Sequence, residues 1–294
     1  MTVSERTLSL SDHGRAPTVA LQALDETGQM RETLICGEHP LTLYLDKREL
    51  VTLMTLGTHP EDLALGWLRN QRIVTSIDAI AAVQVDWDTE SVAITSRGLA
   101  EHGHTLWTGQ EAAALDARLG QRTVTTGCGQ GTVYGDLMST LDIVQWGDHA
   151  GLTRDAVYSV IDQVRGHDTL YKQAGAVHAC ALFSQAQPGL PQLLRFVEDV
   201  GRHNAVDAIA GWMWREGLSG DDLVFYTTGR LTSEMVIKCA QMRIPVLMSR
   251  SGLTGMGHAL AEQLGLTMFA RCQGRHYLLY TGADRLLDSP LSPV

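Results

Sequence analysis

Apolar and polar positions follow two different patterns along this chain, and the change comes near residue 153. Between residues 36 and 125 they alternate around short polar turns, in "PLTLYLDKRELVTLMTLG" and in "IAAVQVDWDTESVAITS", so we predict two β-hairpins. "THPEDLALGWLRNQRI" lies between them and predicts a helix, because Pro60 suits a first helical turn and Glu61 favours its positive end. These segments predict a small α+β domain, which follows an N-terminal arm of residues 1–35.

Helical and strand patterns then succeed one another across residues 153–294. We predict helices from "TRDAVYSVIDQVRG", around "VHACALF", and from "NAVDAIAGWMW", "SEMVIKCAQM" and "MGHALAEQLG". We predict strands from "QLLRFVED", "DLVFYTT", "IPVLMSR", "LTMFA" and "YLLYTG". Repeated strand-helix-strand units need crossover connections, so this α/β domain is expected to hold a mostly parallel sheet covered by helices. Residues 126–152 connect the two domains.

Composition narrows the classes of ligand and partner. The 294-residue chain is 44% hydrophobic, which is enough for two domain cores, and its formal net charge is -10. Nucleic acids and acidic membranes attract clustered lysine and arginine, so we expect neither as a partner. The chain shows no long apolar run and no signal-peptide pattern, which predicts a cytoplasmic protein. Any anionic ligand must therefore bind where positive charge is concentrated locally.

Three predicted strands of the second domain end in similar polar stretches, "FVEDVGRHN", "YTTGRLTSEM" and "LMSRSGLTG". Each precedes a predicted helix. Ligands of open α/β sheets bind outside the carboxyl ends of the strands, where helix N-termini attract anions, so we predict a phosphate or pyrophosphate site. The candidate ligands are the arginines of these stretches and their neighbours, namely Arg202, His203, Gly229, Arg230, Ser249 and Arg250. The alternative is that these are ordinary turns, with the arginines paired to nearby acids.

The chain has five scattered cysteines and no Cys-x-x-Cys pair, which disfavours both a disulfide framework and a structural zinc site. Cys128 lies in "TTGCGQGT", where its glycine neighbours leave two interpretations open: a small buried thiol in a tight turn, or an accessible nucleophile. Cys180 and Cys239 lie in apolar segments and are expected in the core. Cys272, in "ARCQGRHYL", fits either role.

Two further motifs lack residues that known chemistry needs. A zinc deaminase would need a glutamate where Cys180 follows His178 in "VHAC", and a downstream cysteine pair, so we expect no metal site. We expect His178 in the core or in a pocket wall. "GLTGMG" lacks the lysine of a phosphate-binding P-loop, so a nucleotide-dependent enzyme has little support.

Longer motifs resemble one known family. "VEDVGRHNAVD", "TTGRLTSEMVIKCAQMRIPVLMSRSGLT" and "LAEQLGLTMFARCQGRHYLLYTG" are similar to formate dehydrogenase accessory sulfurtransferases of the FdhD type. "EHPLTLYLDKRELVTLMTLGTHPEDLALGWL" and "AGAVHACALF" agree, so the resemblance covers nearly all of residues 36–282.

The resemblance implies a homodimer whose second domain is a three-layer fold like that of cytidine deaminase, without zinc. It implies that the protein receives sulfur from a cysteine desulfurase as a persulfide. The sulfur would pass to the molybdenum of a bis(molybdopterin guanine dinucleotide) cofactor bound for an apo formate dehydrogenase, and GDP or GTP would bind as fragments of that cofactor. The family's cofactor-binding C-terminal segment matches Arg271, Cys272, Gln273, Gly274, Arg275 and His276.

The chain departs from the family at two positions. Family members commonly carry Cys-x-x-Cys in the loop of Cys128, and the second position here is Gly131; a lysine is common where this chain has Ala208. Two hypotheses remain: sulfur transfer through a Cys128 persulfide, or a non-catalytic carrier of the cofactor. If transfer needs a second thiol, Cys272 is the candidate.

Overall fold

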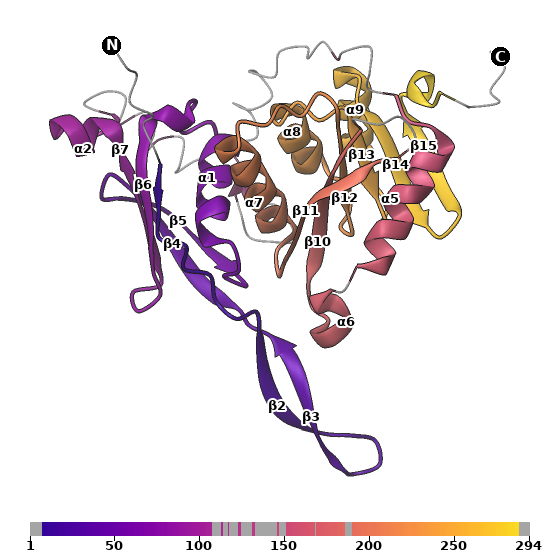
Figure 1. Ribbon diagram of the computed structural model, residues 1–294, viewed down its shortest axis with the longest axis horizontal. Coiled ribbons are helices and arrows are strands. Elements are labelled where there is room, and N and C mark those ends of the chain that lie inside the picture. The colour runs from indigo at the N-terminus through magenta and orange to yellow at the C-terminus, as the bar shows by residue number, and fades with distance from the viewer. Residues whose placement is uncertain are drawn as a thin grey trace. The chain divides into compact units, whose positions relative to one another are not determined.

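The computed structural model describes residues 8–107, 151–167, 169–185 and 190–287, together with residues 113, 117, 123–124, 131–132 and 146. Residue contacts divide the chain into two compact units (Figure 1). Unit 1 comprises Met1–Val133, Leu170–Val177 and Asp199–Glu216, and unit 2 comprises Tyr134–Thr169, His178–Glu198 and Gly217–Val294. The chain therefore enters each unit more than once, whereas the sequence predicted one change of domain.

Unit 1 is built on a five-stranded sheet in the order β1-β6-β7-β4-β5. Its strands are β1 (Ser9–Leu10), β4 (His39–Leu45), β5 (Arg48–Thr55), β6 (Ile80–Asp86) and β7 (Ser91–Ser96), and two short helices accompany them, η1 (Ile77–Ala79) and α2 (Arg97–His102). Both predicted hairpins, β4-β5 and β6-β7, are confirmed.

The β4-β5 turn is fixed by its two central residues, Asp46 and Lys47. Both have positive φ, of 48° and 70°, as a two-residue hairpin turn with the twist of the strands requires. The buried Asp46 carboxylate accepts hydrogen bonds from the backbone N–H and the hydroxyl of Ser96 and from the N–H of Leu106. The turn therefore also anchors the chain that follows β7.

Two helices of unit 1 cross at close range, α1 (Pro60–Asn70) and α7 (Arg202–Arg215). A Cβ on Gly66 would lie 1.7 Å from the carbonyl oxygen of Asp207, and one on Gly211 would lie 1.9 Å from that of Asp62. Only glycine permits such an approach of two backbones. From the sequence, α7 was predicted as part of the C-terminal domain. Its contact with α1 could not be predicted, because backbone packing through glycines leaves no periodic pattern of apolar residues.

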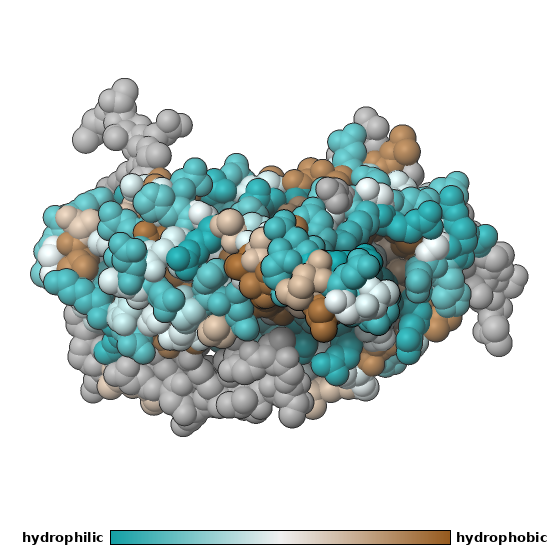
Figure 2. All heavy atoms as spheres, turned by 90° about the horizontal axis from the view of Figure 1, so that it is seen from below, coloured by the Kyte–Doolittle hydropathy of each residue, from teal (hydrophilic) through white to brown (hydrophobic). Residues whose placement is uncertain are grey.

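An exposed hairpin occupies the second half of the predicted N-terminal arm and ends one residue beyond it. It consists of β2 (Thr18–Leu24) and β3 (Met30–Cys36), and the Cys36 thiol donates to the carbonyl of Gly175, beside the short helix α6 (Leu170–Ala174). Figure 2 views the molecule from below, where hydrophobic and hydrophilic residues are interspersed. The large apolar side chains that the hairpin exposes are Val19, Leu21, Leu24, Met30, Leu34 and Ile35.

Unit 2 is built on a six-stranded sheet in the order β11-β10-β12-β13-β14-β15. The strands are β10 (His178–Ser184), β11 (Gln192–Asp199), β12 (Leu223–Thr227), β13 (Val246–Ser249), β14 (Thr267–Gln273) and β15 (His276–Thr281). The helices are α5 (Arg154–Gly166), α8 (Ser233–Gln241), α9 (Gly255–Leu264) and the short η2 (Ala283–Arg285).

Two sequence expectations about this sheet are wrong. "VHACALF" lies in the strand β10 and not in a helix. The sheet is mixed: β12, β13 and β14 are parallel, whereas β10 pairs antiparallel with β12 and β15 pairs antiparallel with β14. Most of β10 is buried, so its apolar run is continuous and cannot be told from a buried helix by periodicity. The mixed α/β character itself is confirmed.

Helices cover both faces of the sheet of unit 2. α5 packs on one face with side chains such as Phe183, Tyr226 and Phe269, in a core that contains no residue of α8 or α9. These two are crossover helices that pack on each other, and right-handed crossovers in one direction place them together on the other face. No helix in the described ranges is long and apolar enough to cross a membrane.

Candidate functional site

The carboxyl ends of β12 and β13 are joined by hydrogen bonds between the loops that follow them. The N–H of Arg250 donates to Thr227 at 3.0 Å, and the N–H of Leu231 donates to Gly252 at 3.0 Å. The Ser249 hydroxyl donates to the carbonyl of Gly229 at 2.7 Å. Of the predicted ligands, Gly229 and Ser249 are therefore parts of the loop framework.

Three exposed arginines lie at this edge of the sheet: Arg230 follows β12, Arg250 follows β13 and Arg271 lies near the end of β14. We call these three residues the arginine rim. Arg271 is tied to the β13 loop, because its N–H donates to Ser251 at 2.9 Å. Among the described residues, neither Arg230 nor Arg271 forms an ion pair with a carboxylate. Arg230 therefore does not fit the alternative interpretation, in which the arginines of the three polar stretches pair with nearby acids.

Two helices begin beside the rim. The Thr254 hydroxyl caps α9 by accepting from the N–H of Gly257, whereas Thr232 at the start of α8 makes no such bond. Free N–H groups and the positive end of the helix dipole add to the attraction that three guanidinium groups exert on anions. The rim is suited to a ligand with more than one phosphate.

Arg202 and His203 are placed differently. They begin α7 in unit 1 and are buried, with 4% and 0% of their surface exposed. The chain before them is held by Asp199, whose carboxylate accepts hydrogen bonds from Thr55, Leu56, Gly201 and Asn204. Burial raises the pKa of Asp199 above its ordinary value, and these hydrogen bonds offset only part of the rise. Arg202 and His203 are therefore buried, unlike the exposed arginines of the rim.

The C-terminal segment of residues 271–276 divides between two environments. Arg271 is exposed at the rim, but Cys272 is buried under α5, and burial raises the pKa of its thiol to about 12. Arg275 follows the Gly274 turn, forms an ion pair with Asp162 of α5 at 3.3 Å and lies over the ring of Tyr158.

Arg275 therefore contacts α5, because β14 extends past the end of β13 and the turn that follows it lies beside this helix. Gln273 and His276 are exposed at the two strand ends that flank this turn. Cys180 and Cys239 are buried, as predicted.

Cys128 lies outside the described residues. On either side of its loop, β8 (Thr123–Val124) and β9 (Gly131–Thr132) pair antiparallel, and Val124 is opposite Gly131. Gly131 is thus a strand residue. No group of three or more metal-ligating side chains occurs in the described part of the chain.

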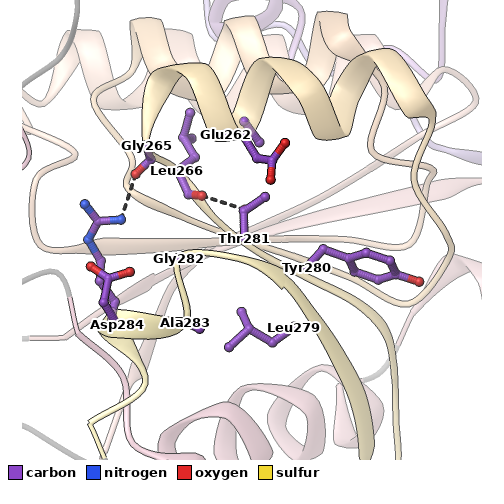
Figure 3. Close-up of a pocket in the computed structure, with 11 residues that line it drawn as sticks. Glu262, Gly265, Leu266, Leu279, Tyr280, Thr281, Gly282, Ala283 and Asp284 are labelled. Atoms are coloured by element: carbon purple, nitrogen blue, oxygen red, sulfur yellow. Dashed lines mark hydrogen bonds between the residues drawn. The ribbon is translucent and has the colours of Figure 1, made fainter. Parts of the chain in front are cut away.

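A pocket of about 480 Å³ lies at the other end of α9, and no sequence motif pointed to it (Figure 3). Glu262 and Asp284 line it, together with Tyr280 and the end of β15. Arg285 donates to the carbonyl of Gly265 at 2.7 Å, so its charge already serves the helix C-terminus. Two carboxylates and a helix C-terminus disfavour an anionic ligand here.

A model of the FdhD/NarQ family matches residues 36–287, which include both the rim and the Cys128 loop. The chain belongs to the FdhD/NarQ family. This FdhD/NarQ protein is 28% identical over 263 residues to the sulfur carrier protein FdhD of Listeria innocua, covering 88% of this chain and 94% of the relative. It is 25% identical over 255 residues to the sulfur carrier protein FdhD of Wolinella succinogenes, covering 87% and 83%.

A solved structure extends the comparison to the fold. A protein from Desulfotalea psychrophila, described as a formate dehydrogenase accessory protein, aligns with a TM-score of 0.72 and 24% sequence identity. The alignment covers 92% of this chain and 100% of that one. The family identified from the sequence motifs is confirmed.

Proposed function

We propose that this FdhD/NarQ protein is an accessory protein of formate dehydrogenase maturation that carries sulfur and binds bis(molybdopterin guanine dinucleotide) as its cargo. The observation that carries the proposal is the arginine rim, three exposed guanidinium groups at strand ends of a chain whose net charge is -10. The names of its relatives, sulfur carrier proteins, support the sulfur part.

The cargo fits the chemistry of the rim. Each of its two dinucleotide halves carries a pyrophosphate and a guanine, so it offers anions to arginines and N–H groups and planar rings to guanidinium faces. Arg230 and Arg271 have no competing carboxylate among the described residues. The acidic pocket at the C-terminus of α9 lacks this complementarity.

Sulfur transfer is assigned to Cys128. Its thiolate would attack the outer sulfur of a cysteine desulfurase persulfide, forming the Cys128 persulfide and releasing the desulfurase thiolate. Cys272 is a poor second thiol, because its sulfur is buried and protonated at neutral pH. The family resemblance implies a second cysteine where this chain has Gly131, and a persulfide needs only one sulfur acceptor. The alternative is a carrier that binds the cofactor without sulfur chemistry.

The other expectations stay proposals of the same kind. They are a cytoplasmic location, a homodimer, and a deaminase-like arrangement of unit 2, for which helices on both faces of its sheet are the support. The partners are a cysteine desulfurase and the apo form of a formate dehydrogenase.

Calorimetry with GDP tests the binding proposal. We expect Arg230→Ala and Arg250→Ala to weaken GDP binding about tenfold each, and binding to fall as salt rises, because charge-assisted phosphate contacts are lost and screened. Arg243→Ala is the matched control, since Arg243 pairs with Asp221 away from the rim. Equal affinities in all four proteins would refute the binding site.

Co-production with the apo-dehydrogenase tests sulfur transfer. We expect Cys128→Ala to abolish dehydrogenase activity while GDP binding survives, and Cys272→Ala to retain activity. Full activity with Cys128→Ala would leave the carrier function instead.

A further inference from the structure

Arg271 has an unusual backbone conformation. Its φ is 57°, in the left-handed region that side chains other than glycine rarely adopt, and the register of β14 and β15 shifts between Ala270 and Gln273. Bulges of this kind re-aim a side chain. The N–H of Arg271 is held by Ser251, so the bulge is fixed to the β13 loop.

The bulge lays the guanidinium group flat on Gly252. A Cβ placed on Gly252 would lie 3.7 Å from Nη2, 3.8 Å from Cζ and 3.8 Å from Nε of Arg271. All points that are equally distant from three atoms of a planar group lie on one line perpendicular to the plane of that group. The three nearly equal distances therefore put the Cβ position above the guanidinium plane. Gly252 therefore faces the flat side of the guanidinium group and not its edge.

The opposite flat side is turned away from this loop, and Arg271 is exposed. Guanidinium groups bind phosphates and the edges of bases with their N–H groups, whereas stacking on a planar base uses their faces. An arginine whose only task was to neutralise phosphate would need neither a fixed plane nor a bulge to fix it. Arg230 and Arg250 already supply charge beside it.

We propose that Arg271 is a stacking platform for the guanine base of the cargo, whereas Arg230 and Arg250 bind its phosphates. This assignment of roles to the three arginines rests on the proposed function, because it requires that a guanine nucleotide binds the rim. It adds a recognition of the planar base that charge alone would not give.

The test compares two ligands, GDP and inorganic pyrophosphate, by calorimetry. Arg271→Lys keeps the charge and loses the planar group, so GDP binding should weaken about tenfold while pyrophosphate binding stays within about twofold of the wild type. Arg230→Ala is the matched control and should weaken both ligands. Thermal melting of each variant establishes that it is folded before binding is measured.

Each contrary result has a distinct meaning. Unchanged GDP binding by Arg271→Lys, or equal losses for GDP and pyrophosphate, would overturn the stacking role. So would a wild-type protein that binds GDP no better than pyrophosphate, since the base then contributes nothing. A wild-type protein that binds neither ligand would overturn the proposed function as well.

Discussion

In unit 1 a Cβ on Gly66 would lie 1.7 Å from the backbone of α7, whereas in unit 2 nothing lies within 4 Å of a Cβ on Gly255. The helix crossing uses glycine to bring two backbones together. The loop beside the rim, with Gly252 and Gly255, uses it where space stays open beside exposed arginines. The same residue type thus allows two backbones to pack closely in one region and leaves open space in the other, and only the neighbours distinguish the two.

The largest effect is expected at the helix crossing. Gly211→Ala places a methyl group 1.9 Å from the carbonyl of Asp62, so α1 and α7 must separate and lose the Asn70–Asp207 hydrogen bond. We expect a loss of at least about 3 kcal/mol of unfolding free energy, measured by urea denaturation, or no folded protein at all.

Gly255→Ala is the matched control for the crossing. It begins α9 with open space around it, and alanine reduces the entropy of the unfolded chain, so stability should stay equal or rise by about 0.5 kcal/mol. If the two alanine variants unfolded alike, the comparison of the two regions would fail.

How much of this could be foreseen differs between the same two regions. Alternation predicted the β4-β5 hairpin correctly, because one face of the sheet is buried and the other is not. The Gly66–Gly211 contact was not predictable, since glycine has no side chain to enter a periodic pattern. At the rim, the Gly-Arg stretches of the sequence correctly indicated that Arg230 and Arg250 would lie at strand ends, where both are exposed. Arg202 lies in a similar stretch but is buried, because its exposure depends on tertiary packing that the spacing of residues does not show.

A medium effect is expected at Cys272, one residue beyond the rim. Its thiol packs in the core beneath α5, so Cys272→Ala should cost about 1 kcal/mol through the lost contacts. Burial raises its pKa from 9.0 to about 12. Between these values the unfolded chain loses the thiol proton while the folded protein keeps it, so the wild type loses stability as pH rises.

Urea denaturation at several pH values measures this. The stability difference between the wild type and Cys272→Ala should shrink as pH rises above about 9, the unfolded-state pKa of the thiol. Rapid alkylation of Cys272 in the native protein at pH 8 would contradict its burial and would restore it as a second sulfur-carrying thiol.

The smallest effect is expected at Gly252, which makes the sharpest contrast with Gly211. A methyl group there would lie 3.7 to 3.8 Å from the Arg271 guanidinium group, an ordinary van der Waals contact, and the φ of Gly252 is not in the left-handed region. Gly252→Ala should therefore change the unfolding free energy by no more than about 0.5 kcal/mol. Because the methyl group supports the covered face of the guanidinium group and leaves the other face open, GDP affinity should also stay within about twofold. A loss of several kcal/mol would mean that the loop is packed as tightly as the helix crossing. A large loss of GDP binding without a loss of stability would place the ligand on the side of Arg271 that faces Gly252, and the base would then have to stack elsewhere.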